Sequence, residues 1–277
     1  MTCARCGKDS NSIHFLLPRT IMIAFITGSG FYEMEGFSQA DHSTRFGTAH
    51  FLAGDINGNP VVILPRHGAA HRNLPHQISH RANLLALKEM GTKAIVSCTV
   101  CGVINPEWHL GSPMVADDLW FPENRLGDGS ACSIFHEPGQ PGRGHLLANS
   151  FFHSKLSQKI RSHFECQGGE CHSGCYAHGN GPRFNSKAEI RAMRTAGADF
   201  LSQTCGPEAV MANELEIPFA LAGFGVDYAN GVQSEPTPIN ILQVNMGRAK
   251  TAFVSLIYSL ASSQDQFNFE NFVYRFE

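Results

Sequence analysis

The chain has little charge and no long apolar run. Charged residues make up 16% of its 277 residues, and the formal net charge is −3. So small a charge gives no electrostatic footprint for a nucleic acid or an anionic membrane. No stretch approaches the roughly 18 consecutive apolar residues of a membrane-spanning helix, and the first 20 residues are too polar for a secretory signal. We therefore expect a cytoplasmic protein with no nucleic-acid or membrane partner.

The familiar cofactor motifs are missing as well. Glu33 stands where a dinucleotide-binding glycine fingerprint needs its third glycine, and no Gly-x-x-x-x-Gly-Lys-Ser/Thr loop occurs. Nine cysteines are present, but zinc-ligand spacing is absent even from the group formed by Cys166, Cys171 and Cys175. The cysteines of a long chain in apolar surroundings are usually reduced thiols. We expect no metal and no organic cofactor.

The N-terminal segment differs from the rest of the chain. Cys3 and Cys6 lie close together, but no second pair follows at zinc-finger spacing, and the first β-rich run begins at Met22. We expect residues 1–21 to be a poorly ordered leader, with Met22 as the functional start. The remaining residues, 22–277, suit one large domain, because no linker, repeat or low-complexity tract divides them.

Apolar β-rich runs alternate with amphipathic stretches along the chain. Strands are predicted at 22–27, 94–101, 200–203 and 218–226, with a hairpin around Asn57-Gly58. Helices are predicted at 75–91, 152–164, 186–195, 207–215 and 238–260, and a long loop at about 121–144. Continuously apolar strands are typical of sheets that are covered on both faces. We therefore expect an α/β fold in which helices cover both faces of a central mixed sheet, itself partly barrel-like.

Polar or glycine-rich segments follow four of the predicted strands. They are Thr27-Gly-Ser-Gly30, Pro65-Arg-His-Gly68, Ser97-Cys-Thr-Val-Cys-Gly102 and Leu201-Ser-Gln-Thr204. Ligands of α/β sheets collect where strands end. The glycine turn offers backbone N–H groups and the Ser29 hydroxyl to an anion, and Arg66 offers a planar fork that matches phosphate oxygens. Each segment alone has an ordinary structural explanation, but together the four indicate one oxyanion site.

Several short motifs carry a family resemblance. They are Gly28-Ser-Gly30, Arg66-His-Gly68, Arg81-Ala-Asn83, Thr99-Val-Cys-Gly102, Gly181-Pro-Arg-Phe184, Ala188-Glu189, Gly197-Ala-Asp199, Pro207-Glu208 and Asp227-Tyr228. In order and spacing they resemble the trimeric purine nucleoside phosphorylase family, most closely its methylthioadenosine and methylthioinosine phosphorylase branch. The resemblance covers about residues 22–262. It implies a homotrimer that cleaves a purine nucleoside with inorganic phosphate as co-substrate, giving free purine and a ribose 1-phosphate.

The resemblance also implies roles for individual residues. The phosphate ligands would be Ser29, Arg66, His67, Thr99, the backbone N–H of Val100, and Thr204. Phe184 resembles the aromatic residue that packs on the base or sugar, and Gln203 falls where the family usually has a methionine beneath the ribose. His145 resembles a histidine that a neighbouring subunit places near the 5′ substituent.

Asp227 is the expected catalytic residue. It follows an apolar run, so burial is expected to raise its pKa and keep part of it protonated. A group that protonates or hydrogen-bonds purine N7 helps the base to leave, and such help is typically worth about 10²–10⁴-fold. A capping or salt-bridged carboxylate is the alternative explanation of this residue.

The predicted base pocket combines Asn185, Asp227 and Ala229. Methylthioadenosine phosphorylases have Ser at the first position and carboxylates at the other two, whereas relatives acting on 6-oxopurines have Glu at the first and Asn at the second. The Asn185 amide can face either base, because it both donates and accepts. The missing carboxylate at Ala229 favours a 6-oxopurine nucleoside such as 5′-methylthioinosine, inosine or guanosine. A methylthioadenosine phosphorylase and a catalytically weakened purine- or phosphate-binding homologue are the alternatives.

Overall fold

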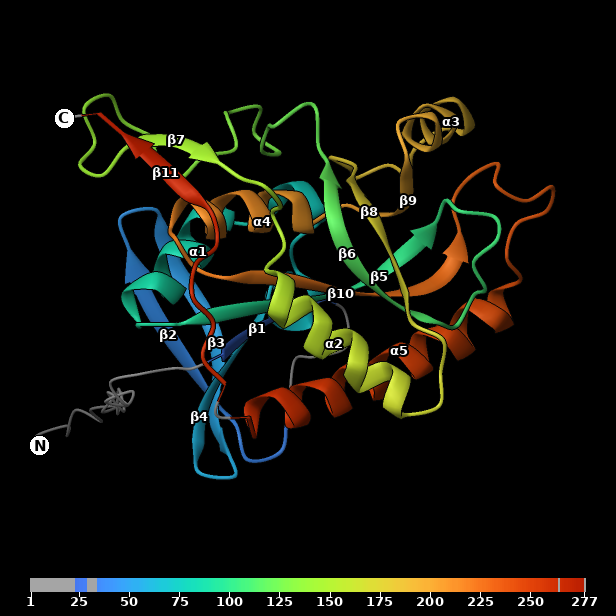
Figure 1. Ribbon diagram of the computed structural model, residues 1–277, viewed down its shortest axis with the longest axis horizontal. Coiled ribbons are helices and arrows are strands. Elements are labelled where there is room, and N and C mark those ends of the chain that lie inside the picture. The colour runs from blue at the N-terminus through green and yellow to red at the C-terminus, as the bar shows by residue number, and fades with distance from the viewer. Residues whose placement is uncertain (1–22, 29–33, 264, 277) are drawn as a thin grey trace, which may run out of the picture.

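The computed structural model describes residues 23–28, 34–263 and 265–276 (Figure 1). Its strands are β1 (Ile23–Thr27), β2 (Ser38–Thr44), β3 (Gly47–Ile56), β4 (Asn59–Pro65), β5 (Ala94–Val103), β6 (Pro113–Trp120), β7 (Gly144–Leu147), β8 (His172–His178), β9 (Ala198–Ser202), β10 (Phe219–Tyr228) and β11 (Phe272–Arg275). Its helices are α1 (His80–Glu89), α2 (Ser154–Cys166), α3 (Lys187–Thr195), α4 (Cys205–Glu214) and α5 (Ile239–Ala261), with 3₁₀ turns η1 (Ala69–His71) and η2 (Pro75–Gln77). The expected leader, residues 1–21, and Met22 lie outside the described residues.

Nine strands form one mixed sheet in the order β10-β6-β8-β9-β5-β1-β4-β3-β2. An additional pairing of β10 with β5 closes five of them into a small barrel, and β1, β4, β3 and β2 extend from β5 as an open arm. β1 runs parallel to β4 and β5, and β10 runs parallel to β5. The expected mixed and partly barrel-like sheet is confirmed.

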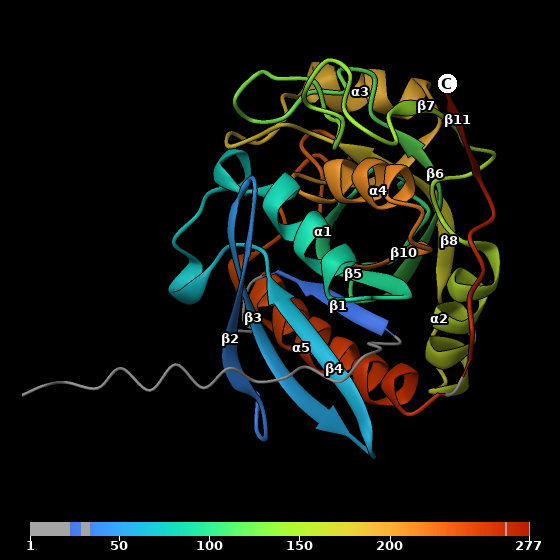
Figure 2. The same cartoon turned by 90° about the vertical axis from the view of Figure 1, so that its left-hand side faces the viewer.

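Helices cover both faces of this sheet, as expected from the continuously apolar strands. α1 and α4 pack on one face, and α2 and α5 on the other (Figure 2). α3 lies beside β9 (Figure 1). β1 shows why the strands are apolar throughout: Ala24 and Ile26 join the core under α1 and α4, whereas Ile23 and Phe25 join the core under α2 and α5. No helix among the described residues is long and apolar enough to cross a membrane.

Most of the predicted elements appear close to their expected positions. Asn57 and Gly58 have φ of 55° and 82° and connect β3 to β4, which is the predicted hairpin. The helix expected over 75–91 is wrong in its first turn, because Ile78 is extended and separates η2 from α1. The strand predicted over 94–101 is longer than expected: β5 continues through Gly102 to Val103, because β9 and β10 both pair with its last residues.

The C-terminal segment returns over the molecule and holds the region before α2. Asn271 accepts from the backbone N–H of Asn149 and donates to the carbonyl of Ser150, and Glu270 accepts from the hydroxyl of Ser154 at 2.8 Å. β11 then pairs with β7 in a separate two-stranded sheet. This pairing fixes the position of β7, which carries His145.

Candidate active site

A cavity of about 530 Å³ opens where β1, β4, β5, β9 and β10 end. Its lining includes every described residue predicted to bind phosphate, base or ribose within one chain: Arg66, His67, Thr99, Val100, Phe184, Asn185, Gln203, Thr204, Asp227 and Ala229. Four of the strands are parallel neighbours, so their carboxyl ends meet at one edge of the sheet. Ser29 lies outside the described residues, but Gly28 directly before it lines the cavity.

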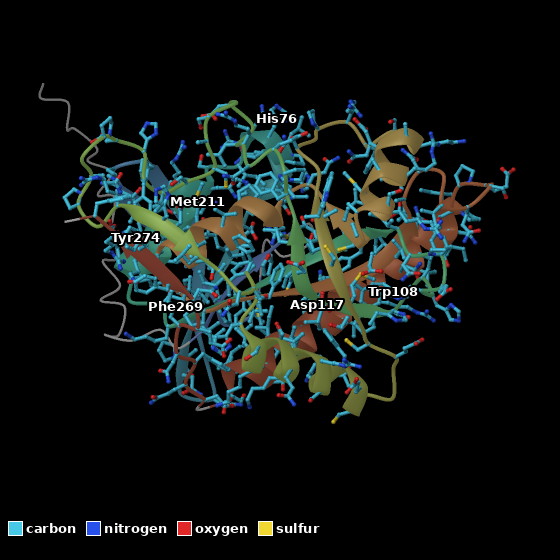
Figure 3. The ribbon with its side chains drawn as sticks, turned by 45° about the horizontal axis from the view of Figure 1, so that its top comes forward. His76, Trp108, Asp117, Met211, Phe269 and Tyr274 are labelled. Atoms are coloured by element: carbon cyan, nitrogen blue, oxygen red, sulfur yellow. The ribbon has the colours of Figure 1, made fainter. Side chains whose placement is uncertain are left out.

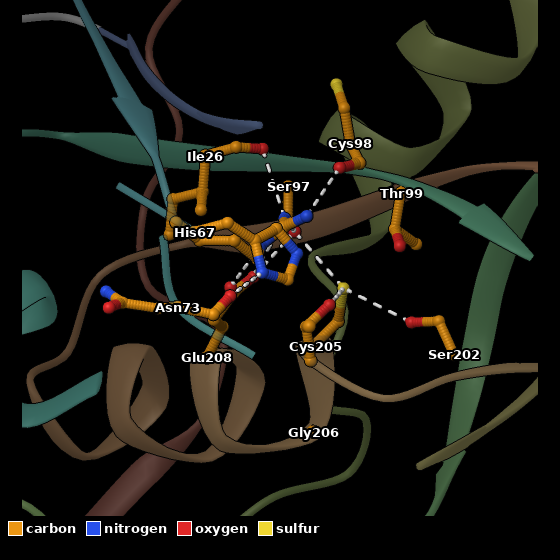
Figure 4. Close-up of polar contacts among 12 residues, drawn as sticks. Ile26, His67, Asn73, Ser97, Cys98, Thr99, Ser202, Cys205, Gly206 and Glu208 are labelled. Atoms are coloured by element: carbon orange, nitrogen blue, oxygen red, sulfur yellow. Dashed lines mark hydrogen bonds and ion pairs between the residues drawn. The ribbon is translucent and has the colours of Figure 1, made fainter. Parts of the chain in front are cut away.

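Arg66 lies at the floor of this cavity and is almost completely buried, with 2% of its surface exposed. Its Nε donates to Glu208 Oε1 at 2.7 Å, and its Nη2 donates to Ser97 Oγ at 2.7 Å (Figure 4). Nη1 donates to the carbonyl of Cys98 at 2.9 Å. Burial alone would lower the pKa of Arg66, but the charge and hydrogen bonds of Glu208 outweigh it and raise that pKa.

These hydrogen bonds limit how Arg66 can bind phosphate. Most donors of the Arg66 guanidinium are already used, so it cannot hold phosphate with both edges as an exposed arginine would. The bond of Nη1 to Cys98 uses one of its two hydrogens. A Cβ on Gly28 would lie 3.1 Å from this Nη1, so the missing side chain keeps the approach to it open. Nη1 is the edge that an oxyanion can reach.

Glu208 and Ser97 were not predicted as site residues, although Glu208 belongs to one of the motifs that carry the family resemblance. Ser97 Oγ also donates to Glu208 Oε2 at 2.7 Å, so the serine and the carboxylate together hold the guanidinium. The available signal was Glu208 itself, an acidic residue in the first turn of a predicted helix whose only other charged residue is Glu214. Burial of an arginine, which creates the need for such a partner, is not visible in the sequence.

His67 follows Arg66 and is buried beside it, with 7% of its surface exposed. Its Nδ1 lies 2.9 Å from the carbonyl oxygen of Asn73, and its ring stacks on His71 at 4.2 Å. Burial and the charge of Arg66 lower the pKa of His67 to about 4, so the ring is neutral at pH 7. The loop between His67 and Asn73 is strained, because Ala70 and His71 both have positive φ, which non-glycine residues rarely adopt.

The remaining predicted phosphate ligands surround the same space. Thr99 and Thr204 are both buried, each with 5% of its surface exposed, and both line the cavity. Thr204 is the N-cap residue of α4. The N–H groups of the first two residues of this helix already donate to the Tyr176 hydroxyl and to His178 Nδ1, and its third residue is a proline, so this helix end offers the cavity few free donors. The structure thus brings two hydroxyls and a guanidinium edge together.

Asp227 lies near the end of β10, at a register irregularity opposite Gly102. Burial raises the pKa of Asp227 to about 6, against a smaller lowering by its own backbone N–H. This is the expected direction. Among the described residues no cation pairs with this carboxylate, in contrast to the salt-bridged alternative. An acid with such a pKa can exist in both protonation states near neutral pH, as a proton donor must.

The residues predicted to bind the base and the ribose line the same cavity. The Asn185 amide lies 3.5 Å from Glu189 Oε2, and Asn230, which sequence reasoning missed, donates to the Asn185 carbonyl at 2.7 Å. Gln203 donates through Nε2 to the carbonyl of Arg183 at 2.9 Å, which leaves its amide oxygen as an acceptor. Phe184 lines the cavity, is 81% exposed and belongs to no hydrophobic core cluster of the described residues.

His145 does not line this cavity. It lies on β7 opposite Tyr274, with its ring edge-on to Phe276 at 5.3 Å. Figure 3 shows Tyr274 at the end of the molecule opposite Trp108. The assignment of His145 to the cavity of a neighbouring subunit stays a prediction.

The seven described cysteines are all free, including Cys166, Cys171 and Cys175. Within residues 23–28, 34–263 and 265–276, no three His, Cys, Asp or Glu side chains are grouped so as to hold a metal ion. Burial raises the pKa of the Cys205 thiol beside the Arg66 pair, with a further contribution from Glu208. The Cys205 thiol is therefore protonated near neutral pH.

Comparison with known proteins gives a consistent result. The family model described as the phosphorylase superfamily matches residues 22–261. A probable 6-oxopurine nucleoside phosphorylase of Thermococcus kodakarensis is 32% identical, over 76% of this chain and 80% of its own length. An S-methyl-5′-thioadenosine phosphorylase of Caenorhabditis briggsae is also 32% identical, over 75% of this chain and 74% of its own. A crystal structure of a methylthioadenosine phosphorylase from an antarctic soil metagenomic library has a TM-score of 0.77 at 24% identity, covering 90% of this chain and 89% of its own.

Proposed function

Since the chain belongs to the phosphorylase superfamily, we propose that it is a purine nucleoside phosphorylase, a pentosyltransferase that cleaves the N-glycosidic bond with inorganic phosphate. One observation carries the proposal: oxyanion donors and a protonatable carboxyl line the same cavity, from strands far apart in sequence. A phosphorolytic site needs both, because it must hold the nucleophile on one side of the sugar and assist the leaving base on the other.

The reaction follows from this arrangement. Thr99, Thr204 and the free edge of Arg66 hold phosphate below the sugar, with Ser29 and the backbone N–H of Val100 as the other proposed donors. A phosphate oxygen forms the new bond to C1′ while the bond from C1′ to N9 breaks. The electron pair of that bond passes into the purine ring. Asp227, in its protonated form, donates to N7 and neutralises the departing base.

We propose a 6-oxopurine nucleoside as substrate. Ala229 contributes only a methyl group at 9% exposure, so a second carboxylate to accept from a 6-amino group is missing at that position. The Asn185 amide can face a 6-oxo group through its nitrogen, as it now faces Glu189. Relatives named 6-oxopurine nucleoside phosphorylase, from Thermococcus kodakarensis and Pyrococcus furiosus, support this choice. Methylthioadenosine is the second candidate, supported by the relatives and solved structures with that name.

We also propose that the protein acts as a cytoplasmic homotrimer in purine salvage, in which a neighbour's His145 approaches the 5′ substituent. Large apolar side chains on β7, on β11 and directly after β11 lie around this histidine and are exposed in the single chain: Leu147, Phe272, Tyr274 and Phe276. A contiguous apolar surface of this kind is typical of a protein interface. Light scattering of the purified protein tests the assembly, and a monomeric mass would contradict it.

An activity panel tests the proposed function. Inosine, guanosine, 5′-methylthioinosine, adenosine and methylthioadenosine are each incubated with and without phosphate, and release of free base is followed. We expect phosphate-dependent release from a 6-oxopurine nucleoside and a raised KM for phosphate in Thr99→Val, which removes one hydroxyl at nearly constant volume. Release that does not need phosphate would contradict the proposal. Absence of turnover with every nucleoside would leave the weakened purine-binding homologue.

A further inference from the structure

The partner of His67 Nδ1 determines which ring nitrogen carries the proton. The carbonyl oxygen of Asn73, at 2.9 Å, can only accept a hydrogen bond, so Nδ1 must be the donor. A neutral imidazole has one N–H, and His67 uses it here. Its Nε2 therefore has a lone pair and can only accept. Unlike Thr99 or Arg66, this residue has no hydrogen to offer to an oxyanion.

The groups that face His67 keep the ring neutral. Arg66 precedes it at the end of β4, His71 stacks on it from η1, and His80 of α1 is close enough for the two rings to disfavour each other's charge. Burial and the neighbouring His178, Arg66 and His67 lower the pKa of His80 to about 3, so this ring is neutral too. The buried carboxylate of Glu208 is paired with Arg66. No described carboxylate pairs with His67.

A phosphate dianion placed against Nε2 would bring two lone pairs together. The contact becomes favourable in two ways: phosphate binds with one oxygen protonated and donates it to Nε2, or the ring takes up a proton and donates. Both complexes hold one proton more than a free dianion and a neutral ring. The proton balance is therefore the same wherever the proton resides.

Building on the proposed phosphorylase function, we infer that His67 makes the site bind an oxyanion together with one proton, so that it selects phosphate over the proton-free dianion sulfate. Phosphate brings its own proton when it binds as the monoanion. Sulfate has none near neutral pH, so its contact with Nε2 requires a protonated ring. His67 thereby adds chemical selectivity to a cradle whose other donors would accept either anion.

Binding of an oxyanion together with one proton makes its affinity depend on pH. Above the second ionisation of phosphate, phosphate affinity should fall about tenfold for each pH unit, because each complex must take one proton from solution. Sulfate should follow the same slope at lower pH, where His67 titrates. With a pKa of about 4, roughly one ring in a thousand is protonated at pH 7, so sulfate should bind at least about tenfold more weakly than phosphate there.

Titration calorimetry of the full chain with inorganic phosphate tests this. Measurements at pH 8.5 in two buffers with different ionisation enthalpies give the number of protons taken up per phosphate bound. We expect about one at pH 8.5 and close to none at pH 6, where phosphate is mostly monoanionic. Binding without proton uptake at pH 8.5, or equal affinity for sulfate and phosphate at pH 7, would overturn the inference. Absence of any phosphate binding would instead count against the proposed function.

Two variants locate the proton. His67→Gln places a terminal amide near Nε2, and its N–H can donate, so phosphate should bind without proton uptake and sulfate should gain relative to phosphate. Asp227→Asn is the matched control, since this carboxyl is the other cavity group that titrates near neutral pH. It should keep the uptake of one proton. Loss of uptake in Asp227→Asn, or retention in a folded His67→Gln protein, would assign the proton elsewhere and refute the role of His67.

Discussion

Replacing Glu208 with glutamine should destabilise the protein strongly and make phosphate a stronger stabiliser than in the native chain. The two side chains of the Arg66–Glu208 pair are each 1% exposed, and Nε lies 2.7 Å from Oε1. Glutamine keeps the shape of the carboxylate but not its charge. The substitution therefore leaves the Arg66 guanidinium buried without a counter-charge.

The expected loss can be estimated from this burial. Removing one partner of a buried ion pair typically costs about 3–5 kcal/mol of the free energy of unfolding, because the remaining ion has lost its hydration. At about 2–4 °C per kcal/mol for a chain of this size, the melting temperature should fall by about 6–20 °C. Bound phosphate would restore a counter-charge near Nη1. Its stabilising effect should then be larger in Glu208→Gln than in the native protein.

The chain supplies a matched control in Arg161 and Glu165. This pair has the same Nε–Oε1 distance of 2.7 Å, but its side chains are 49% and 46% exposed. Because water already solvates both charges, Glu165→Gln should cost less than about 0.5 kcal/mol. Thermal unfolding of the three proteins, at one concentration with and without phosphate, makes the comparison. Equal losses in the two variants, or a phosphate effect that does not grow in Glu208→Gln, would refute the role given to this pair.

Three further predictions concern catalysis and packing. Asp227→Ala should lower kcat about 10²–10⁴-fold with a much smaller rise in KM, and an unchanged kcat in steady-state assays would remove this role. The kcat/KM of the native enzyme should fall as pH rises through about 6, because only the protonated carboxyl donates. Gln203→Met removes the amide oxygen that we expect to accept a hydrogen bond from the ribose 2′-hydroxyl. Since one hydrogen bond contributes about 0.5–1.5 kcal/mol, the preference for ribonucleosides over 2′-deoxynucleosides should fall several-fold in kcat/KM, and an unaltered ratio would show that the amide does not contact the sugar. Gly206→Ala should lower the free energy of unfolding by about 1–3 kcal/mol, because its Cβ would lie 2.7 Å from His178. Gly247→Ala, whose Cβ would meet open space beside α5, should raise it by about 0.5–1 kcal/mol. Similar shifts of the melting temperature in the two variants would contradict this packing.

The elements around the site could be predicted because their signals are local. The Asn57-Gly58 turn requires positive φ, and the apolar stripe of α5 repeats with helical spacing, so both appear where they were expected. β6 and β8 were missed, since polar residues interrupt their sequences and the closed barrel alone makes them strands. The strand predicted over 94–101 stops before Gly102, because glycines commonly end strands. Two neighbouring strands keep this glycine in β5.

Residue types at strand ends predicted which side chains line the cavity, but not how they are engaged. Arg66 was expected to meet phosphate with its full fork, and only the fold shows that Glu208, 142 positions later, already holds most of it. Likewise, nothing before the structure indicates that Asn73 determines the tautomer of His67. Such contacts depend on tertiary distances that no local pattern encodes.

β5 joins the two parts of the sheet that carry the side chains assigned to the substrates. This strand belongs both to the closed barrel and to the open arm, so the cavity lies at the seam between them. The arm carries Arg66 and His67, which we propose to act only on the anion, whereas the side chains assigned to the purine lie on barrel strands or follow them. Exchanging barrel loops could therefore redirect the enzyme to another base while the arm continues to deliver the same nucleophile.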